Sequence, residues 1–141
     1  MSKRRKVTRM LIAVFAMATL FSVVALADSY HMFAYEYNGQ PLKSPAVTKN
    51  NTNSQAMAKS LASHNGVTSN ALDGNGNITA YSTLSNGAGG ASGRMLFTRY
   101  NQTVYGTYGS IHRNSLYVLQ ATLNDCDFTG RAMYQNFQWL P

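Results

Sequence analysis

Short segments rich in β-forming residues, separated by turn-forming residues, most constrain what this chain can fold into. Eight such segments follow one another along the chain: 30–38, 55–61, 67–72, 77–84, 94–101, 103–108, 115–123 and 132–140. Most of them carry the aromatic and β-branched residues that favour strands. Short segments at intervals of roughly ten residues are typical of antiparallel sheets that pack face to face or close on themselves. The sequence therefore predicts an all-β fold, a small antiparallel β-sandwich or barrel of about seven to eight short strands.

Alternation within these segments predicts which side chains face the core. In segment 30–38, Phe33, Tyr35 and Tyr37 share one face of the predicted strand, because successive side chains of a strand point to opposite sides. In the last segment, Phe137 and Trp139 likewise share a face. We expect these two residues to anchor the core, since large aromatic side chains bury the most apolar area.

The connecting segments carry their own signals. Segment 55–61 (QAMAKSL) fits both a helical turn and a strand, and we expect a strand because its neighbours are strands. Residues 73–76 (DGNG) supply positive φ angles easily and predict a hairpin between segments 67–72 and 77–84. Segment 85–93 (SNGAGGASG) contains four glycines and is expected to be a mobile loop between two halves of a sheet.

The N-terminus has the three parts of a secretory signal peptide. Residues 1–10 carry five basic side chains and no acid, residues 11–27 are uncharged and almost wholly apolar, and Ala-Leu-Ala closes the segment. We expect a helical signal peptide over residues 1–27, cleaved after Ala27, and a single secreted β domain over residues 28–141. The alternative is an uncleaved membrane anchor, because 17 residues are close to the minimum that spans a bilayer.

Net charge changes when this segment is set aside. The whole chain has a formal charge of +7, but residues 28–141 carry seven basic and five acidic side chains, a net charge of +2. These cations are scattered along the sequence instead of clustered, which argues against a nucleic-acid partner. A mild attraction to an anionic envelope surface remains compatible with this charge.

The chain has one cysteine, Cys126, so we expect no intrachain disulfide, and stability must come from packing and sheet hydrogen bonds. Asp125 and Asp127 flank this cysteine. Two neighbouring carboxylates raise the pKa of a thiol and make it a poor nucleophile. We therefore expect Cys126 to be a small, partly buried side chain of little reactivity.

Motifs for catalysis or metal binding are weak. The Asp-x-Asn-x-Asn spacing at residues 73–77 resembles the start of a calcium loop, but Leu84 stands where a bidentate glutamate would be needed. The three histidines, His31, His64 and His112, lie in different segments, and none has a second metal ligand at a suitable spacing. No Gly-x-Ser-x-Gly elbow and no acid pair are evident. The sequence predicts no catalytic residue, no metal and no cofactor.

Tyrosine is the residue type that stands out. All nine tyrosines lie after residue 27, and only about half of the positions in a two-layer sheet face inward, so several rings are expected on the surface. Exposed tyrosines on a rigid sheet can stack on sugars or dock a partner chain, with cations nearby. The candidate surface-binding residues are Tyr35, Tyr37, Arg94, Arg99, Tyr105, Tyr108 and Arg113.

Three features together resemble the lactococcin 972-like bacteriocins, small secreted β-sandwich peptides of Gram-positive bacteria. They are the short basic signal peptide, the cysteine-poor chain rich in Asn, Ser, Tyr and Gly, and the aromatic C-terminal segment 137–141 (FQWLP). This resemblance implies a bacterial source and action at the cell envelope without catalysis. It assigns no role to any particular residue.

We therefore expect a secreted, non-catalytic protein that acts at the bacterial cell envelope, as a bacteriocin-like or surface-binding protein. A cell-wall polymer, an anionic envelope surface or a membrane protein are the expected partners. The alternatives are a wall-polysaccharide adhesion module without toxicity and a small secreted hydrolase.

Overall fold

The computed structural model describes residues 28–141, so the predicted signal peptide and its cleavage site lie outside the described residues. The described chain forms eleven β-strands: β1 (Ser29–Tyr35), β2 (Pro41–Lys43), β3 (Val47–Thr48), β4 (Gln55–Leu61), β5 (Ser63–His64), β6 (Val67–Thr68), β7 (Asn77–Leu84), β8 (Met95–Phe97), β9 (Thr103–Thr107), β10 (Leu116–Asn124) and β11 (Met133–Leu140). Within residues 28–141, no helix has the length and apolar content needed to cross a membrane.

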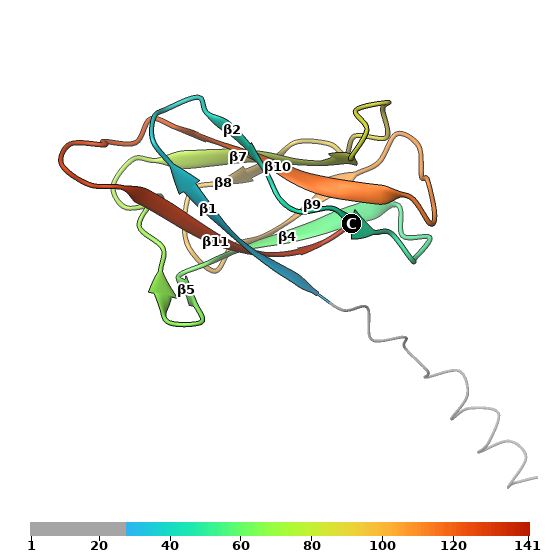
Figure 1. Cartoon of the computed structure of the whole chain (residues 1–141), viewed down its shortest axis with the longest axis horizontal. Coiled ribbons are helices and arrows are strands. Elements are labelled where there is room, and N and C mark those ends of the chain that lie inside the picture. The colour runs from blue at the N-terminus through green and yellow to red at the C-terminus, as the bar shows by residue number, and fades with distance from the viewer. Residues whose placement is uncertain (1–27) are drawn as a thin grey trace, which may run out of the picture.

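Two antiparallel sheets face each other (Figure 1). Sheet A has the strand order β1-β11-β4-β9, and sheet B has the order β2-β10-β7-β8, with β3 also paired to β10. A small third sheet, β5-β6, extends from the end of β4. The all-β antiparallel prediction is confirmed, and the arrangement is that of a sandwich. The prediction of a strand at residues 55–61 is also confirmed, by β4.

Sheet A pairs large side chains with small ones on its inner face. Trp139 of β11 lies opposite Ala58 of β4, and Phe137 lies opposite Ser60. All four residues are fully buried. The small side chains of β4 leave room for the two aromatic rings, which confirms Phe137 and Trp139 as core residues.

Phe137 also joins the two sheets. Its ring lies 5.0 Å from that of Phe97 in sheet B and 5.7 Å from that of Phe33 on β1, both edge to face. Aromatic pairs in this geometry contribute about 0.5–1.5 kcal/mol beyond their area of burial. The centre of the core is therefore an aromatic cluster built from β1, β8 and β11.

The hairpin predicted across residues 73–76 is wrong. Strand β6 pairs with β5, whereas β7 pairs with β10 and β8. The intervening chain crosses between the sheets, and Ala71 and Leu72 are buried in the core as it does so. The predicted positive φ is found at Gly74, but the apolar side chains before it hold the segment inside the sandwich instead of extending β6.

The last two residues of the glycine-rich segment 85–93 are hydrogen-bonded to neighbouring strands. The expectation of a loose loop along the whole segment therefore does not hold at this end. Ser92 is buried, and its Oγ accepts a hydrogen bond from the backbone N–H of Ser82. The backbone N–H of Gly93 donates to the carbonyl of Thr107 on β9. A Cβ added to Gly106 would lie 2.5 Å from the carbonyl oxygen of Gly93. This close approach connects the β8 side of sheet B to the β9 edge of sheet A.

Cys126 is a free, buried cysteine, as predicted. Burial is the main cause that raises the pKa of its thiol; the positive charge of Arg131 opposes this rise, and the negative charges of Asp127 and Asp73 add to it. Asn38 holds this segment, because its side chain exchanges two hydrogen bonds with the backbone of Cys126. The cysteine is therefore a packed structural residue.

Candidate functional site

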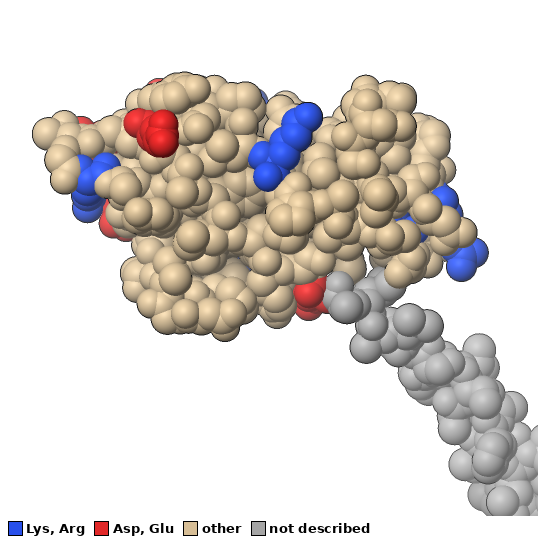
Figure 2. Space-filling view, in the orientation of Figure 1, with Lys and Arg blue, Asp and Glu red and all other residues tan. Residues whose placement is uncertain are grey.

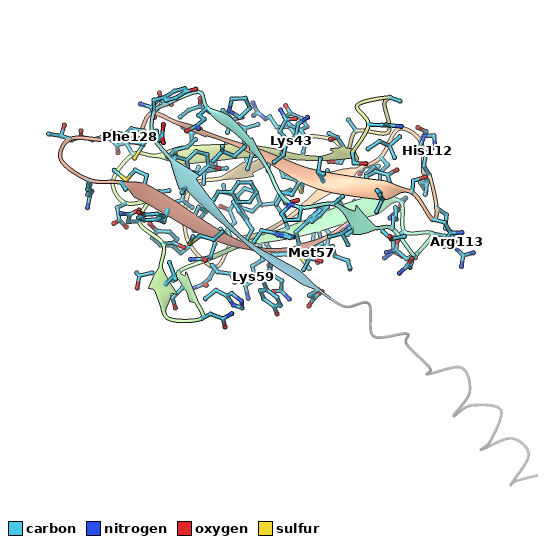
Figure 3. The ribbon with its side chains drawn as sticks, in the orientation of Figure 1. Lys43, Met57, Lys59, His112, Arg113 and Phe128 are labelled. Atoms are coloured by element: carbon cyan, nitrogen blue, oxygen red, sulfur yellow. The ribbon has the colours of Figure 1, made fainter. Side chains whose placement is uncertain are left out.

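The outer face of sheet A exposes a row of apolar side chains from three adjacent strands. Met57 of β4 lies opposite Tyr105 of β9 on one side and opposite Leu140 of β11 on the other. The side chain of Tyr105 is 58% exposed, and those of Met57 and Leu140 are half-buried. Met57 and Lys59, labelled in Figure 3, alternate on β4 with the buried Ala58. The strand therefore turns its larger side chains outward and its small ones to the core.

This row forms the floor of a groove that we call the Tyr105 groove. Its cavity measures about 360 Å³ and is lined by Asn53, Ser54, Gln55, Met57, Tyr105 and Leu140. Its lining combines an aromatic ring and two apolar side chains with two amides and a hydroxyl. Concave sites that combine an apolar floor with a few hydrogen-bonding groups are the usual form of a ligand site.

Hydrogen bonds hold the polar rim of the Tyr105 groove in place. Asn51 accepts a bond from the backbone N–H of Asn53 at 2.9 Å. The carbonyl of Ser54 accepts a bond from the backbone N–H of Tyr108. Gln55 donates from its side chain to the hydroxyl of Thr107 at 3.2 Å. The rim is therefore ordered by its own contacts, which lowers the entropy lost on binding.

A buried lysine lies beneath this rim. Lys49 is fully buried, its Nζ donates to Oδ1 of Asn51 at 2.7 Å, and it lies 4.8 Å from the centre of the Tyr108 ring. Burial lowers the pKa of this ammonium. The hydroxyl of Tyr108 in turn lies 2.6 Å from that of Ser82. The ammonium of Lys49 lies over the Tyr108 ring and donates to the Asn51 side chain. These two contacts help to hold the loop that carries Asn53 and Ser54.

Replacing this lysine gives a testable result for stability. We expect Lys49→Met to change the pH dependence of the free energy of unfolding, because the variant keeps the apolar stem but lacks the titrating ammonium. At pH 7, removing the cost of burying a charge is offset by the loss of the hydrogen bond to Asn51 and of the contact with the Tyr108 ring. The folded-state pKa of Lys49 lies below its ordinary value of 10.5, so the unfolded chain binds more protons between these two pKa values. Wild-type stability should therefore gain from Lys49 as pH rises through this interval, and the variant should lack that gain.

Urea unfolding at a series of pH values from 7 to about 10 measures this difference. The buried tyrosines are present in both proteins, so their ionisation largely cancels in the comparison. The matched control is Lys43→Met, because Lys43 is exposed on β2. A variant at Lys43 that changed the pH profile as much as Lys49→Met would show that burial of Lys49 is not the cause.

The structure separates the residues predicted to bind a surface. Tyr105 and Tyr37 are each 58% exposed, and Arg94, Arg99 and Arg113 are exposed. Of these five, only Tyr105 lines the Tyr105 groove. Arg113 lies with His112 in the loop before β10, at the end of the sandwich (Figure 3). The predicted set is therefore not one site.

Two of the predicted surface tyrosines are wrong because they are core residues. Tyr35 is 1% exposed and lies on the inner face of β1, where burial raises the pKa of its phenol. Tyr108 is 6% exposed and packs edge to face on Tyr117 at 5.3 Å. Burial is also the main cause that raises the pKa of Tyr108. Tyr37 is exposed instead of sharing the buried face of Phe33, because β1 ends at Tyr35.

The polar rim and the apolar floor of the Tyr105 groove could not be predicted from the sequence. The alternation of Met57 and Leu61 with small residues was visible, but it does not say which face of the strand is buried. The answer depends on Phe137 and Trp139, which come from a strand about 80 residues later and fill the space above the small side chains. The six groove residues come from β4, β9, β11 and the loop before β4, so no local motif could collect them.

A second aromatic contact lies on the same face of sheet A. The ring of Tyr30 on β1 stacks on that of His64 on β5, with centroids 4.4 Å apart and planes 2° from parallel. Tyr30 lies opposite Gln138, which lies opposite Lys59. Among the strands of sheet A, the charged residue is Lys59, and its side chain lies on the outer face beside the groove.

The described residues contain no group of three or more His, Cys, Asp or Glu side chains that could hold a metal ion. The residues that line the Tyr105 groove include no carboxylate, imidazole or thiol. The groove can therefore stack the Tyr105 ring on an apolar face of a ligand and form hydrogen bonds with its hydroxyl or amide groups.

Comparisons of the chain with protein-family models, with curated proteins and with solved structures found no match.

Proposed function

We propose that this is a secreted, non-catalytic protein that acts at the bacterial cell envelope by binding a neutral wall polysaccharide in the Tyr105 groove. The observation that carries this proposal is the exposed ring of Tyr105 beside the amides and hydroxyl of residues 53–55. A sugar ring has an apolar C–H face that can stack on tyrosine. It also has hydroxyl groups that both donate to and accept from amide side chains.

The charge distribution supports a neutral ligand. None of the residues that line the groove is charged. Figure 2 shows the Lys and Arg side chains of one face as separate groups divided by uncharged surface. An anionic polymer would gain most from clustered cations. A neutral glycan needs the hydrogen-bonding groups that the groove supplies.

Two further features support binding without catalysis at the envelope. Glycoside cleavage uses a pair of carboxyl groups across the bond that breaks, and the groove lining supplies neither acid nor base. Export is supported by the sequence of residues 1–27, with its basic start, apolar segment and Ala-Leu-Ala ending.

A sedimentation assay with the exported protein tests this proposal. The protein is mixed with isolated cell walls, with walls stripped of their anionic polymers, and with anionic lipid vesicles. We expect it to sediment with both wall preparations, because the ligand is a neutral glycan, and to stay in solution with the vesicles. Loss of binding after the anionic polymers are removed, or binding to vesicles alone, would contradict the proposal.

Growth inhibition and substrate turnover are measured beside the binding. Inhibition of related strains would identify a bacteriocin-like toxin in place of an adhesion protein. Turnover of a wall substrate that is lost on substitution of His31, His64 or His112 would replace the proposal with a hydrolase.

A further inference from the structure

Strand β1 is an edge of sheet A that lacks the usual protection against pairing. It has seven residues, SYHMFAY, with no Lys, Arg, Asp, Glu or Pro among them. It pairs with β11 on one side only. Natural edge strands are normally short, carry charge or Pro, or are covered by another segment, because free backbone groups are a template for another strand.

The other edges of the two sheets have such protection. Strand β2 has three residues, begins with Pro41 and ends with Lys43. Strand β8 also has three residues. Strand β9 is covered in part, because the carbonyl of Thr107 accepts a hydrogen bond from Gly93. Among the edges in residues 28–141, β1 is therefore the one open to a full-length partner strand.

The register shows which backbone groups of β1 are free. On β11, the backbone N–H groups of Tyr134 and Asn136 donate to side chains of Asn70 and Ser69, on the side away from β1. Backbone groups alternate in direction along a strand, so the odd-numbered residues of β11 bond to β1. These lie opposite Ser29, His31, Phe33 and Tyr35. The N–H and C=O groups of Tyr30, Met32 and Ala34 consequently point to the open edge.

The side chains of β1 make this edge both rigid and apolar. Inward-facing Phe33 and His31 pack on Phe137 and Trp139, with ring centroids 5.7 and 5.9 Å apart. On the outer face, Met32 is 52% exposed, and Tyr30 is 46% exposed although one face of its ring stacks on His64. A rigid edge with two large exposed apolar side chains gains buried area when a strand is added.

We propose that a second copy of this chain occupies the edge, through antiparallel β1–β1 pairing about a two-fold axis at His31. In this register, Tyr30 of each copy lies opposite Met32 of the other, and the free backbone groups of both residues face each other. Each such pair exchanges two hydrogen bonds. The contact also covers the exposed thioether with an aromatic ring, a favourable combination.

Charge repulsion disfavours the alternative register in which the two-fold axis passes through Met32. Moving the two-fold axis to Met32 would place Asp28 of one copy opposite Glu36 of the other, and both are exposed carboxylates. Like charges directly opposite each other destabilise a strand pair. With the axis at His31, the two His31 residues lie opposite each other and Asp28 lies opposite Ala34, so no carboxylates meet.

The pairing also affects binding, in a step that rests on the proposed function. Tyr30 and Met32 point to the same face of sheet A as Tyr105. A two-fold axis perpendicular to the joined sheet leaves both Tyr105 grooves on one side. A polymer could then engage both grooves at once, whereas a short oligosaccharide would engage one.

Sedimentation equilibrium of the exported protein tests the dimer without any ligand. We expect wild type to be a dimer at micromolar concentration and Met32→Lys to be a monomer, because a lysine on an edge strand disfavours the addition of a second strand, which would strip water from its ammonium. The control is Leu116→Lys, since Leu116 is 50% exposed on sheet B, and it should remain dimeric. A monomeric wild type, or a Met32→Lys variant as dimeric as wild type, would overturn the proposal.

Cross-linking tests the register independently of the charge variant. In a Cys126→Ser background, a mixture of Tyr30→Cys and Met32→Cys proteins should form disulfide-linked dimers faster than either protein alone, because only the mixture places the two thiols opposite each other. Equal rates in all three samples would rule out pairing about His31. If wild type dimerises in this way but fails to bind walls, the proposed function is wrong and the dimer stands.

Discussion

Tyr105→Ala is expected to weaken binding to isolated cell walls by about 30-fold, which corresponds to the roughly 2 kcal/mol lost when an aromatic anchor of a binding site is truncated. The side chain of Tyr105 is 58% exposed and is the aromatic residue of the groove floor. The variant should fold normally, since so exposed a ring contributes little to the core. Binding isotherms with purified walls, together with a thermal melt, measure both effects.

Tyr37→Ala is the matched control for this experiment. Tyr37 has the same exposed fraction, 58%, but lies in the turn after β1, outside the groove. It should leave wall binding unchanged. Tyr105→Phe keeps the stacking ring and should retain most of the affinity. If Tyr37→Ala weakened binding as much as Tyr105→Ala, general surface aromaticity would explain the binding better than the groove does.

Local sequence patterns predicted most of the strands of this fold. The segments 94–101, 103–108 and 132–140 contain the strands β8, β9 and β11, and segment 115–123 covers β10 except for its last residue. Strand identity depends on neighbouring residues, which the sequence displays directly. The core positions of Phe137 and Trp139 were predictable for the same reason, because period-two alternation and side-chain size are local properties.

Strand partners could not be predicted in this way. The glycine-containing turn at residues 73–76 has hairpin chemistry, yet β7 pairs with β10, about 40 residues later in the chain. Pairing depends on which strands bury their apolar faces together, and this is a property of the whole sandwich. The Tyr105 groove depends on the same long-range pairing, since Met57 meets Tyr105 and Leu140 only through the register of three strands.

Tyrosine exposure also depended on this long-range order. Tyr105 and Tyr108 are three residues apart, but one lies in the open groove and the other in the core. Three is an odd number, so strand alternation alone places them on opposite faces. The sequence could separate the two rings but could not say which one faced the solvent.

Phe137→Ala is expected to lower the free energy of unfolding by about 3–5 kcal/mol, the usual loss when a fully buried phenylalanine is truncated. The ring is fully buried and contacts Phe97 of sheet B and Phe33 of β1. Its removal leaves a cavity between the two sheets, at a place where both are held by strand pairing and cannot collapse. A loss of this size is a large part of the roughly 5–15 kcal/mol that stabilises an ordinary domain.

Urea unfolding followed by circular dichroism measures this loss, with Phe128→Ala as the control. Phe128, at the upper left of the sandwich in Figure 3, is only partly buried and packs against the margin of the core. It should lose about 1 kcal/mol or less, because its side chain leaves an opening to solvent instead of an enclosed cavity. The slope of unfolding free energy against urea should stay the same in both variants, which would show that only native-state packing has changed. Equal losses for the two variants would contradict the placement of Phe137 at the centre of the aromatic cluster that joins sheet A to sheet B.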